Sequence, residues 1–334
     1  MDLASTIKDV AKEAGVSIAT VSMVINKKAD HITMKTKKKV FDAIERLDYK
    51  PNLTARSLVS AKSFTVGLLV PDITNPFFAE LAKAFEKELS REGYMTLLCS
   101  SFEESEREKQ YLSELISRGV DGVVICSLTS METQILDALK QAKIPYLILD
   151  NRYALEEFSV HVDDYKGGVL AASELLENGH KTTAFIGSKN PYDNIYNRLQ
   201  GFRNEIERAG GEVLTFETEL TRNGGEAVAE KLFSSEATAA FCSNDLIAVG
   251  LYDAADKHNL ALPEELSVIG FDDISFSDIV KPRLTTIKQP VGLLAEKAVQ
   301  HLLLMKKDPE YHFYKELIPV SLVKRESVTK PARD

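Results

Sequence analysis

Polar and aromatic residues that suit a polyhydroxylated ligand follow the predicted strands at several points along this sequence. They comprise carboxylates, amides, guanidinium groups and a pair of phenylalanines, at residues 75–78, 150–152, 198, 244–245, 272–273 and 289. Such polar groups make paired hydrogen bonds to adjacent hydroxyls, and phenyl rings cover the apolar face of a sugar ring. Because an unpaired polar group in a closed site costs about 1–3 kcal/mol, the site would reject ligands that lack the matching hydroxyls. Each residue also has a structural interpretation, since Asn75 and Asp272 are suited to cap a helix or a turn and the phenylalanines suit a core.

The sequence lacks the spacing patterns of common catalytic, cofactor and metal sites. It contains no Gly-x-Ser-x-Gly, no His-x-x-x-His among its six histidines, and no Gly-x-Gly-x-x-Gly or Gly-x-x-x-x-Gly-Lys after a strand. Asp272 and Asp273 are adjacent carboxylates, but neighbouring strand residues point to opposite faces, so they should not share a proton. The glycine pairs at 167–168, 210–211 and 224–225 are interpreted as turns and helix ends. We therefore expect no enzyme activity, no cofactor and no bound metal.

Basic residues are concentrated at the N-terminus of an otherwise acidic chain. Residues 1–62 carry ten Lys and two Arg against seven Asp and Glu, a net charge of about +5 within a total of −9. Residues 63–334 therefore carry about −14, and only the small basic head is suited to a polyanion such as nucleic acid. At 334 residues the chain is long for one hydrophobic core, so we expect two or three domains.

Composition indicates a globular protein in a reducing compartment. Apolar residues make up 44% and charged residues 27%, and the apolar runs at 66–70 and 123–126 are far shorter than a membrane span. No basic stretch followed by an apolar run opens the sequence, so no secretory signal is predicted. Cys99, Cys126 and Cys242 lie in apolar runs without zinc or disulfide spacing, which indicates buried thiols. We expect a cytoplasmic protein with no membrane partner.

Three short helices are predicted in the first 50 residues. Residues 6–9, Thr-Ile-Lys-Asp, have the spacing of a helix start, and Gly15 ends this first helix. Ser17 is suited to cap a second helix from 18 to about 26, and a third helix runs from 33 to about 48. A tight Gly turn between two short helices is typical of a helix-turn-helix unit, although a plain helical bundle with solvated lysines has the same spacing.

The second of these helices has two distinct faces. Val21, Val24 and Ile25 fall together and can pack against the first helix. The opposite face carries Ile18, Ala19, Ser22, Met23 and Asn26. That face is therefore available for contacts outside the head.

After the head, the chain changes to alternating strands and helices. Residues 51–60 cannot bury themselves and are marginal as an isolated helix, so they are interpreted as a linker or as a hinge helix that orders on binding. Strands are predicted at 66–71, 96–100, 122–127, 146–150, 184–188, 213–217, 239–243 and 268–272. Apolar strands separated by helices are typical of parallel sheets covered on both faces. About ten strands in a body of this length favour two such lobes, with ligands expected beyond the carboxyl ends of the strands.

An ordered series of motifs resembles the lactose-repressor/galactose-repressor family. The series runs Thr6-Ile7-Lys8-Asp9-Val10-Ala11, Ala14-Gly15-Val16-Ser17, Thr20-Val21-Ser22, Val24-Ile25-Asn26, Leu47-Asp48-Tyr49-Lys50-Pro51-Asn52 and Ala55-Arg56-Ser57-Leu58. The similarity continues to about Glu326, so it covers nearly the whole chain. The resemblance implies an α/β fold with a three-helix helix-turn-helix head and a two-lobed body like the periplasmic binding proteins, built on two parallel doubly wound sheets.

The same resemblance implies a division into domains. It gives a DNA-binding head at residues 1–50, a hinge helix or linker at 51–62, and an effector-binding and dimerisation domain at 63–334. The lobes of that domain would comprise about 63–162 with 291–317, and about 165–288 with 319–330. Crossings between the lobes are expected near Asp163–Asp164, Gln289–Pro290 and Ile318–Pro319.

The family resemblance also implies a function. It describes a cytoplasmic, homodimeric transcriptional regulator, in the simplest case a repressor, whose two heads bind near-palindromic double-stranded operator DNA. A small sugar-like effector between the lobes would set the affinity for DNA, and the same cleft serves either sign of coupling. A purine or a sugar acid is an alternative effector within the family. A solute-binding protein would explain two lobes but not the basic head.

Residues that match the family's functional positions fall into three groups. The implied phosphate contacts are Thr6, Ser17, Thr20, Ser22, Asn26 and Thr36. The implied base-reading residues are Ile18, Ala19, Met23, Ala55 and Leu58, and apolar side chains of this kind meet thymine methyl groups but cannot clamp a guanine. The implied effector contacts are Asn75, Phe77, Phe78, Asp150, Arg198, Asn244, Asp272 and Gln289. Two departures concern the effector, since Asn151 stands where the family often has Arg and Leu220 where it often has an aromatic residue.

Overall fold

Three helices at the N-terminal end of the chain pack around a small apolar core. They are α1 (Ile7–Ala14), α2 (Ile18–Ile25) and α3 (Met34–Arg46). Val10, Val21 and Val40, one from each helix, are fully buried at the centre of this core. The computed structural model describes residues 5–25, 31–49, 63–126, 134–149, 158–188, 193–308, 310–311 and 315–332.

The head helices begin and end where local backbone geometry dictates. The Asp9 carboxylate accepts hydrogen bonds from the backbone nitrogen and the hydroxyl of Thr6, at 2.8 and 2.7 Å, at the start of α1. Gly15 follows α1 with a left-handed φ of 65°. The third helix ends at Arg46 rather than near residue 48, because Asp48 adopts a left-handed φ of 41°.

The chain forms two compact units, residues 1–63 and residues 64–334. The predicted hinge at residues 51–62 lies outside the described part of the chain, and so do Ala55 and Leu58 within it. The hinge helix and the domain boundaries derived from the family resemblance therefore stay predictions.

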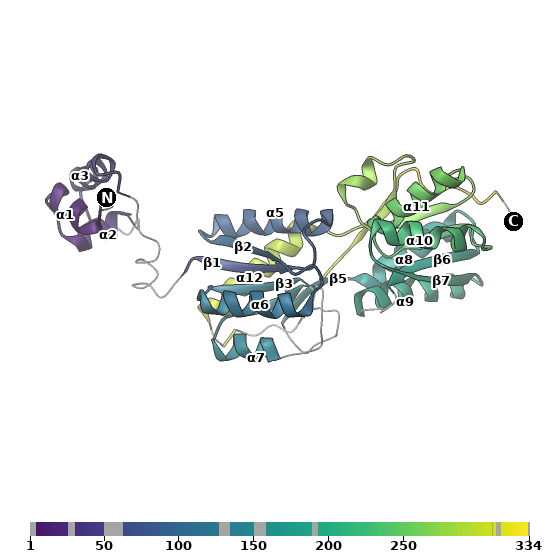
Figure 1. Cartoon of the computed structure of the whole chain (residues 1–334), viewed down its shortest axis with the longest axis horizontal. Helices are drawn as coiled ribbons and strands as arrows, with labels where there is room; N and C mark the ends of the chain where they lie inside the picture. Colours follow the sequence, from purple (N-terminus) through teal and green to yellow (C-terminus); the bar gives the residue numbers. More distant parts are fainter. Residues whose placement is uncertain are drawn as a thin grey trace. The chain divides into compact units, whose positions relative to one another are not determined.

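The N-terminal sheet of the body has six parallel strands in the order β11-β5-β4-β3-β1-β2. These strands are β1 (Thr65–Val70), β2 (Met95–Ser100), β3 (Gly122–Cys126), β4 (Tyr146–Leu149), β5 (Ser159–Val162) and β11 (Lys315–Ile318). One face is covered by α5 (Pro76–Arg91) and α12 (Val291–Lys307), and the other by α6 (Ser105–Ser117) and α7 (Gln134–Gln141) (Figure 1). Burial on both faces explains why β3 and β4 consist of apolar residues without polar alternation.

The C-terminal sheet also has six strands, in the order β12-β10-β9-β8-β6-β7. They are β6 (Thr182–Ser188), β7 (Glu212–Thr218), β8 (Ala239–Cys242), β9 (Ser267–Asp272), β10 (Thr285–Lys288) and β12 (Ser321–Val323). The edge strand β12 runs antiparallel to β10, while the other neighbouring pairs are parallel. One face is covered by α8 (Asp164–Glu177) and α9 (Asp193–Arg208), and the other by α10 (Arg222–Phe233) and α11 (Asp245–His258). A short 3-10 helix, η1 (Ser275–Asp278), follows β9.

The chain passes between the two sheets three times, after β5, after β10 and after β11. This α/β architecture, with a helical head and two doubly wound sheets, confirms the predicted fold class. The strand predictions omitted β5, β10, β11 and β12. Each of these has only three or four residues and includes polar ones, so none shows an apolar run like those of the equally short β4 and β8.

Two of the glycine pairs interpreted as turns lie inside helices instead. The pairs at 167–168 and 224–225 belong to α8 and α10, whereas Gly210 follows α9 with a left-handed φ of 79°. A Cβ atom at Gly168 would lie 2.1 Å from the backbone oxygen of Arg198 in α9. These glycines therefore serve close helix packing, which a local sequence pattern does not reveal.

Gly168→Ala is expected to destabilise the body, because the added methyl group cannot fit unless the backbone of α9 moves. Overpacking of this kind costs about 1–3 kcal/mol, so thermal unfolding followed by circular dichroism should show a clearly lower Tm. Gly292→Ala in α12 is the matched control, because no neighbouring atom lies within 4 Å of its added Cβ and alanine favours a helix. Equal Tm values for the two variants would contradict the packing argument.

Candidate functional site

The outer face of α2 carries apolar side chains that are exposed to solvent. Ile18 is 44% exposed, Met23 is 41% exposed, and Ala19 is exposed beside them. Val21 and Val24 on the opposite face are buried, as the two-faced pattern predicts. Exposed apolar groups on a small basic unit are suited to thymine methyl groups in the major groove.

Most of the predicted phosphate contacts lie near the beginnings of the head helices, whereas Ser22 lies in the middle of α2. Those within the described residues are Thr6, Ser17, Thr20, Ser22 and Thr36, and Asn26 lies outside them. Thr6 directly precedes α1, Ser17 directly precedes α2, and Thr36 lies in the first turn of α3. The Ser17 hydroxyl also caps its helix, since it accepts the backbone N–H of Thr20 at 3.1 Å. Helix N-termini carry free N–H groups and partial positive charge, and both favour phosphate binding.

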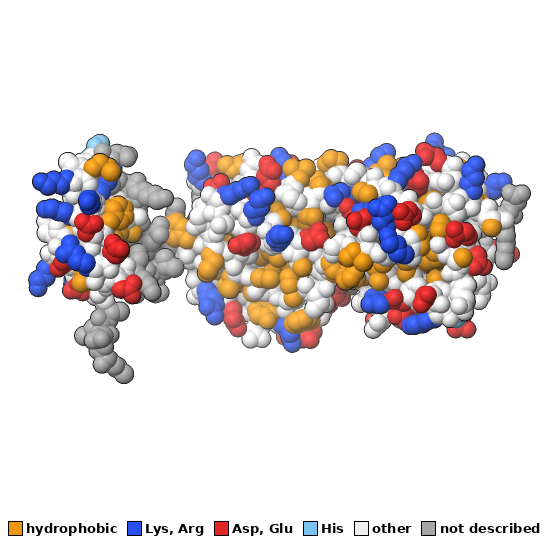
Figure 2. Space-filling model, turned by 90° about the horizontal axis from the view of Figure 1, so that it is seen from above, with side chains coloured by type: hydrophobic (Ala, Val, Ile, Leu, Met, Phe, Trp, Pro, Cys, Tyr) orange, Lys and Arg blue, Asp and Glu red, His pale blue; other side chains and the backbone are white. Residues whose placement is uncertain are grey.

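Lysine and arginine side chains are spread over the surface of the head, as Figure 2 shows in blue. Lys35, Lys38 and Lys39 near the start of α3 are exposed. Arg46 instead forms an exposed ion pair with Glu13 at 2.9 Å. The lysines therefore supply the positive charge that attracts a polyanion.

A cavity of about 750 Å³ lies in the body and is lined by residues that follow strands of both sheets. It contains seven of the eight predicted effector contacts: Asn75, Phe77, Phe78, Arg198, Asn244, Asp272 and Gln289. The eighth, Asp150, lies outside the described residues. The side chains meet because parallel strands deliver the residues after their carboxyl ends to one edge of each sheet. The volume is in the range of small-molecule sites.

Arg198 is held rigidly in the wall of this cavity. Its Nε donates to Oδ1 of Asp164 at 2.8 Å, and its Nη1 donates to the backbone oxygen of Ser243 at 2.6 Å. The guanidinium carbon lies 3.5 Å from the centroid of the Phe271 ring, a cation–π contact. The Arg198 and Asp164 side chains are only 7% and 9% exposed. These contacts occupy two of the five N–H donors, which leaves others for a ligand.

Asp272 and Gln289 form a second buried pair in the cavity wall. The Gln289 Nε2 donates to Oδ1 of Asp272 at 2.7 Å. Asp272 has a φ of 117°, a conformation that is strained for any residue other than glycine. Backbone strain of this kind is concentrated at binding sites, where the surrounding structure maintains it.

Asn75 and Asn244 cap helices as well as lining the cavity. The Asn75 Oδ1 accepts the backbone N–H of Phe77 at 3.0 Å. The Asn244 Oδ1 accepts the backbone N–H of Ile247 at 2.9 Å, and its Nδ2 donates to the backbone oxygen of Leu220 at 3.0 Å. The structural interpretation as a cap therefore holds for Asn75. Asn244, for which no cap was predicted, is the N-cap of α11.

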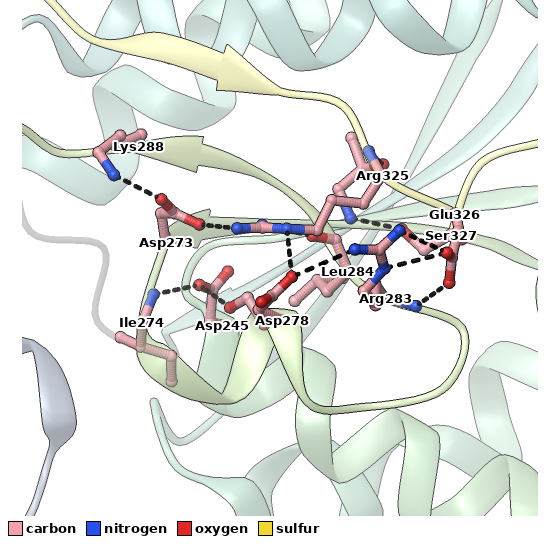
Figure 3. Close-up of polar contacts among 12 residues, drawn as sticks. Asp245, Asp273, Ile274, Asp278, Arg283, Leu284, Lys288, Arg325, Glu326 and Ser327 are labelled. Carbon is pink, nitrogen blue, oxygen red and sulfur yellow. Dashed lines mark hydrogen bonds and ion pairs between the residues drawn. The ribbon is translucent and has the colours of Figure 1, made fainter.

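A buried carboxylate ties together three elements that carry cavity residues. Asp245, the first residue of α11, is fully buried and accepts a hydrogen bond from the backbone nitrogen of Ile274 at 3.0 Å (Figure 3). The hydroxyls of Ser277 and Thr286 donate to the same carboxylate at 2.6 Å each. Ile274 lies in the loop after β9, and Thr286 lies in β10, so α11, β9 and β10 are joined through one side chain. Burial raises the pKa of Asp245 to about 6, although these three hydrogen bonds oppose the shift.

Asp273 has partners that are separate from those of Asp272. Lys288 Nζ donates to Oδ2 of Asp273 at 2.9 Å, and Arg325 Nη2 donates to its Oδ1 at 2.7 Å. Figure 3 shows these two cations approaching Asp273 from opposite sides. The two adjacent carboxylates therefore have different partners. The expected reason for this, alternation along a strand, does not apply, because β9 ends at Asp272 and Asp273 has a left-handed φ of 61°.

Two cavity residues that the sequence analysis missed have buried polar atoms without a hydrogen-bond partner among the described residues. They are Asn194, whose Oδ1 is unpaired and which is 9% exposed, and Ser243, whose Oγ is unpaired and which is fully buried. Such atoms are unfavourable unless a bound molecule pairs with them. Asn194 precedes Arg198 by one helical turn, so helical spacing was a signal for it, whereas no pattern marked the Ser243 hydroxyl. Leu220, one of the two departures from the family, also lines the cavity.

Comparison with known proteins relates both units to one family. The family described as bacterial regulatory proteins, lacI family, matches residues 6–52, and a periplasmic binding protein-like domain matches residues 172–328. The ribose operon repressor of Halalkalibacterium halodurans is 34% identical over 326 residues, which cover 97% of this chain and 97% of that protein. This chain belongs to the LacI family.

Solved structures support the membership in the LacI family. The Lac repressor dimer bound to operator is 27% identical and matches with a TM-score of 0.86 over 98% of this chain and 100% of its own. A LacI family regulator from Enterococcus faecium with bound ribose is 35% identical and has a TM-score of 0.74 over 80% of this chain and 99% of its own. The protein is therefore a DNA-binding transcriptional regulator with a periplasmic-binding-protein-like body, as the motif series predicts.

Membrane-spanning helices and clusters of metal ligands are absent from the described part of this LacI-family chain. No described helix is long and apolar enough to cross a membrane. No group of three or more His, Cys, Asp or Glu among the described residues could hold a metal ion. Cys99, Cys126 and Cys242 are buried and form no disulfide within the described residues.

The raised pKa of Asp245 predicts a pH dependence of stability. Because its pKa of about 6 in the folded state exceeds the ordinary value of 3.8, the protonated form favours folding, and this contribution is lost as pH rises through 6. Relative to Asp245→Asn, which is neutral throughout, the wild type should lose about 1–2 kcal/mol between pH 5 and pH 8. Urea unfolding gives the free energy of unfolding of both proteins at each pH. Subtracting the value for Asp245→Asn from that for the wild type removes the contribution of all other titrating groups. A difference that does not change with pH would show that Asp245 titrates normally.

Proposed function

We propose that this regulator is a repressor that binds a near-palindromic operator as a homodimer, under the control of a small sugar-like effector in the cavity. Among its relatives, the Halalkalibacterium halodurans protein is a ribose operon repressor and the Enterococcus faecium regulator holds ribose. The Lac repressor structure is a dimer on its operator. Because a transcriptional regulator acts on the chromosome, we expect the protein in the cytoplasm and assign it no enzymatic role.

The convergence of oriented polar groups on one cavity carries the effector proposal. Arg198 offers hydrogen-bond donors, and the Asp272 carboxylate offers acceptors, and both are held in place by buried partners. The Asn194 Oδ1 and Ser243 Oγ have no partner within the described part of the chain. A ring that carries several hydroxyls can donate to and accept from such a set at the same time.

The apolar part of the cavity comes from the other sheet. Phe77 and Phe78 lie at the start of α5, after β1, and their rings meet edge to face with centroids 5.1 Å apart. A ligand that contacts these rings and Arg198 touches both lobes. It changes the arrangement of the lobes only if it binds one arrangement more tightly than the other. Such differential binding is what would couple the effector to DNA affinity.

The outer face of α2 supports the proposal for DNA recognition. Ile18, Ala19 and Met23 are proposed to contact bases, with hydroxyls near the helix starts on the flanking phosphates. The family resemblance adds Ala55 and Leu58, with Leu58 as an apolar wedge in the minor groove. Since one head of this size reads few base pairs, two heads related by symmetry would supply the specificity.

Asp272→Ala should abolish the effector response while operator binding without effector stays near normal. Losing a charge-assisted hydrogen bond in a closed site costs about 2–3 kcal/mol, or about 30- to 150-fold in effector affinity. Calorimetric titration of the full chain with D-ribose, sugar acids and purines measures this affinity. Asp256→Ala, which removes an exposed carboxylate of α11, is the control and should bind like the wild type.

The two parts of the effector proposal fail in different ways. If none of these compounds binds the wild type, the sugar-like effector is wrong. If a compound binds and Asp272→Ala lowers Tm without changing its affinity, Asp272 is a turn cap and not an effector contact.

Operator binding by the full chain should weaken steeply between about 50 and 200 mM salt, because the basic head displaces counterions from DNA.

Met23→Ala should weaken binding to an operator selected in vitro by about 1 kcal/mol, or about fivefold. It should not alter the salt dependence, because the Met23 thioether would meet a base and not a phosphate. Phe41→Ala removes another exposed apolar side chain of the head, outside the predicted contacts, and should have little effect. Fluorescence anisotropy measures all three affinities. A selected operator that requires guanine opposite Met23 would contradict this assignment.

A further inference from the structure

Phe64, the first residue of the body unit, has an unusual backbone conformation. Its φ is 52°, in the left-handed region, where the Cβ atom of a bulky residue crowds the neighbouring carbonyl. In the sequence it directly follows the segment that joins the DNA-binding head to the body. A strained residue persists only where its surroundings hold it, so the contacts of Phe64 indicate what sets the chain direction at this point.

Contacts from two segments distant in sequence hold Phe64. Its backbone nitrogen donates to Oδ2 of Asp121 at 2.5 Å, and its backbone oxygen accepts the N–H of Met95 at 2.8 Å. Its ring centroid lies 6.0 Å from that of Tyr94. The backbone nitrogen of Asp121 also donates to the oxygen of Thr65 at 2.7 Å, so Asp121 bonds to both of the first two residues of the body.

The Asp121 carboxylate is itself oriented by a buried charge partner. Its Oδ1 forms an ion pair with the Lys306 ammonium in the last turn of α12. The Asp121 side chain is 3% exposed and the Lys306 side chain 21% exposed. A carboxylate buried to this degree needs such a partner, because an unpaired buried charge is strongly unfavourable. Lys306 therefore keeps the acceptor for the Phe64 N–H in place.

We propose that Asp121 and Lys306 are positioning residues for specific DNA binding, which act by fixing the direction in which the chain leaves the body toward the head at Phe64. A specific site on DNA demands a definite place and orientation of each head, so this direction affects its affinity. Nonspecific binding depends on the charge of the head and is much less sensitive to the direction. The proposal rests on DNA binding and is independent of the effector.

The experiment compares specific with nonspecific binding in full-length variants. The wild type first selects a duplex from a random pool, and each protein is then titrated with that duplex and with an unrelated duplex of equal length, well below its Tm. Lys306→Met should weaken binding to the selected duplex by about tenfold or more and change binding to the unrelated duplex by less than about threefold. Lys307→Met, the matched control, removes the same charge from the exposed neighbouring residue and should change neither. Lys306→Arg, which restores the ion pair, should recover specific binding.

A second variant separates positioning from stability. Lys306→Met leaves Asp121 charged and unpaired and can lower Tm, whereas Asp121→Leu/Lys306→Met replaces the pair with apolar side chains of similar volume, which often preserves stability. The double variant still lacks the acceptor for Phe64, so its binding to the selected duplex should stay about tenfold weaker even where its Tm matches the wild type. Specific binding within about threefold of the wild type in this variant would overturn the proposal. Equal losses on the selected and the unrelated duplex would overturn it as well.

Discussion

A buried ion pair between Arg198 and Asp164 is the contact on which the cavity depends. Asp164 begins α8 directly after the chain has crossed from the N-terminal sheet, and Arg198 lies in α9, so the pair connects the crossing to the cavity wall. Arg198 also donates to the backbone of Ser243 and packs over Phe271, so residues of three other elements or loops hold one guanidinium. Breaking a buried pair by removing one partner costs about 3–5 kcal/mol, and the donors of Arg198 are therefore in place before any ligand binds.

Helix α12 connects the wall of the cavity to the start of the body. It begins at Val291, two residues after Gln289 in the cavity wall, and its last turn contains Lys306, which pairs with Asp121. Asp121 in turn holds Phe64, where the segment from the DNA-binding head enters the body. Packed helices are among the elements that carry coupling between distant sites, and α12 extends from the cavity wall to the residues that hold the start of the body.

Much of the fold and of the cavity could be predicted from the sequence, because these features depend on neighbours along the chain. The hydrogen bonds between Thr6 and Asp9, the left-handed Gly15 and the two faces of α2 are local, and they define the head. Apolar runs separated by helices were enough to indicate parallel sheets. The gathering of residues such as Asp272 and Gln289 at one cavity was predictable as well, since parallel strands all end at the same edge of their sheet.

The remaining features were decided only by the tertiary structure, because they depend on distances between segments far apart in the sequence. Gly168 was interpreted as a turn, yet it lies in a helix that packs against α9 too closely for a side chain. The short strands β5 and β11 include polar residues and show no apolar run, and they are strands because β5 pairs with both β4 and β11. The Asn194 Oδ1 and Ser243 Oγ atoms are buried without a hydrogen-bond partner among the described residues, which no local pattern of the sequence determines. Composition and spacing specify which groups a segment offers, whereas only the packed chain specifies which of them meet.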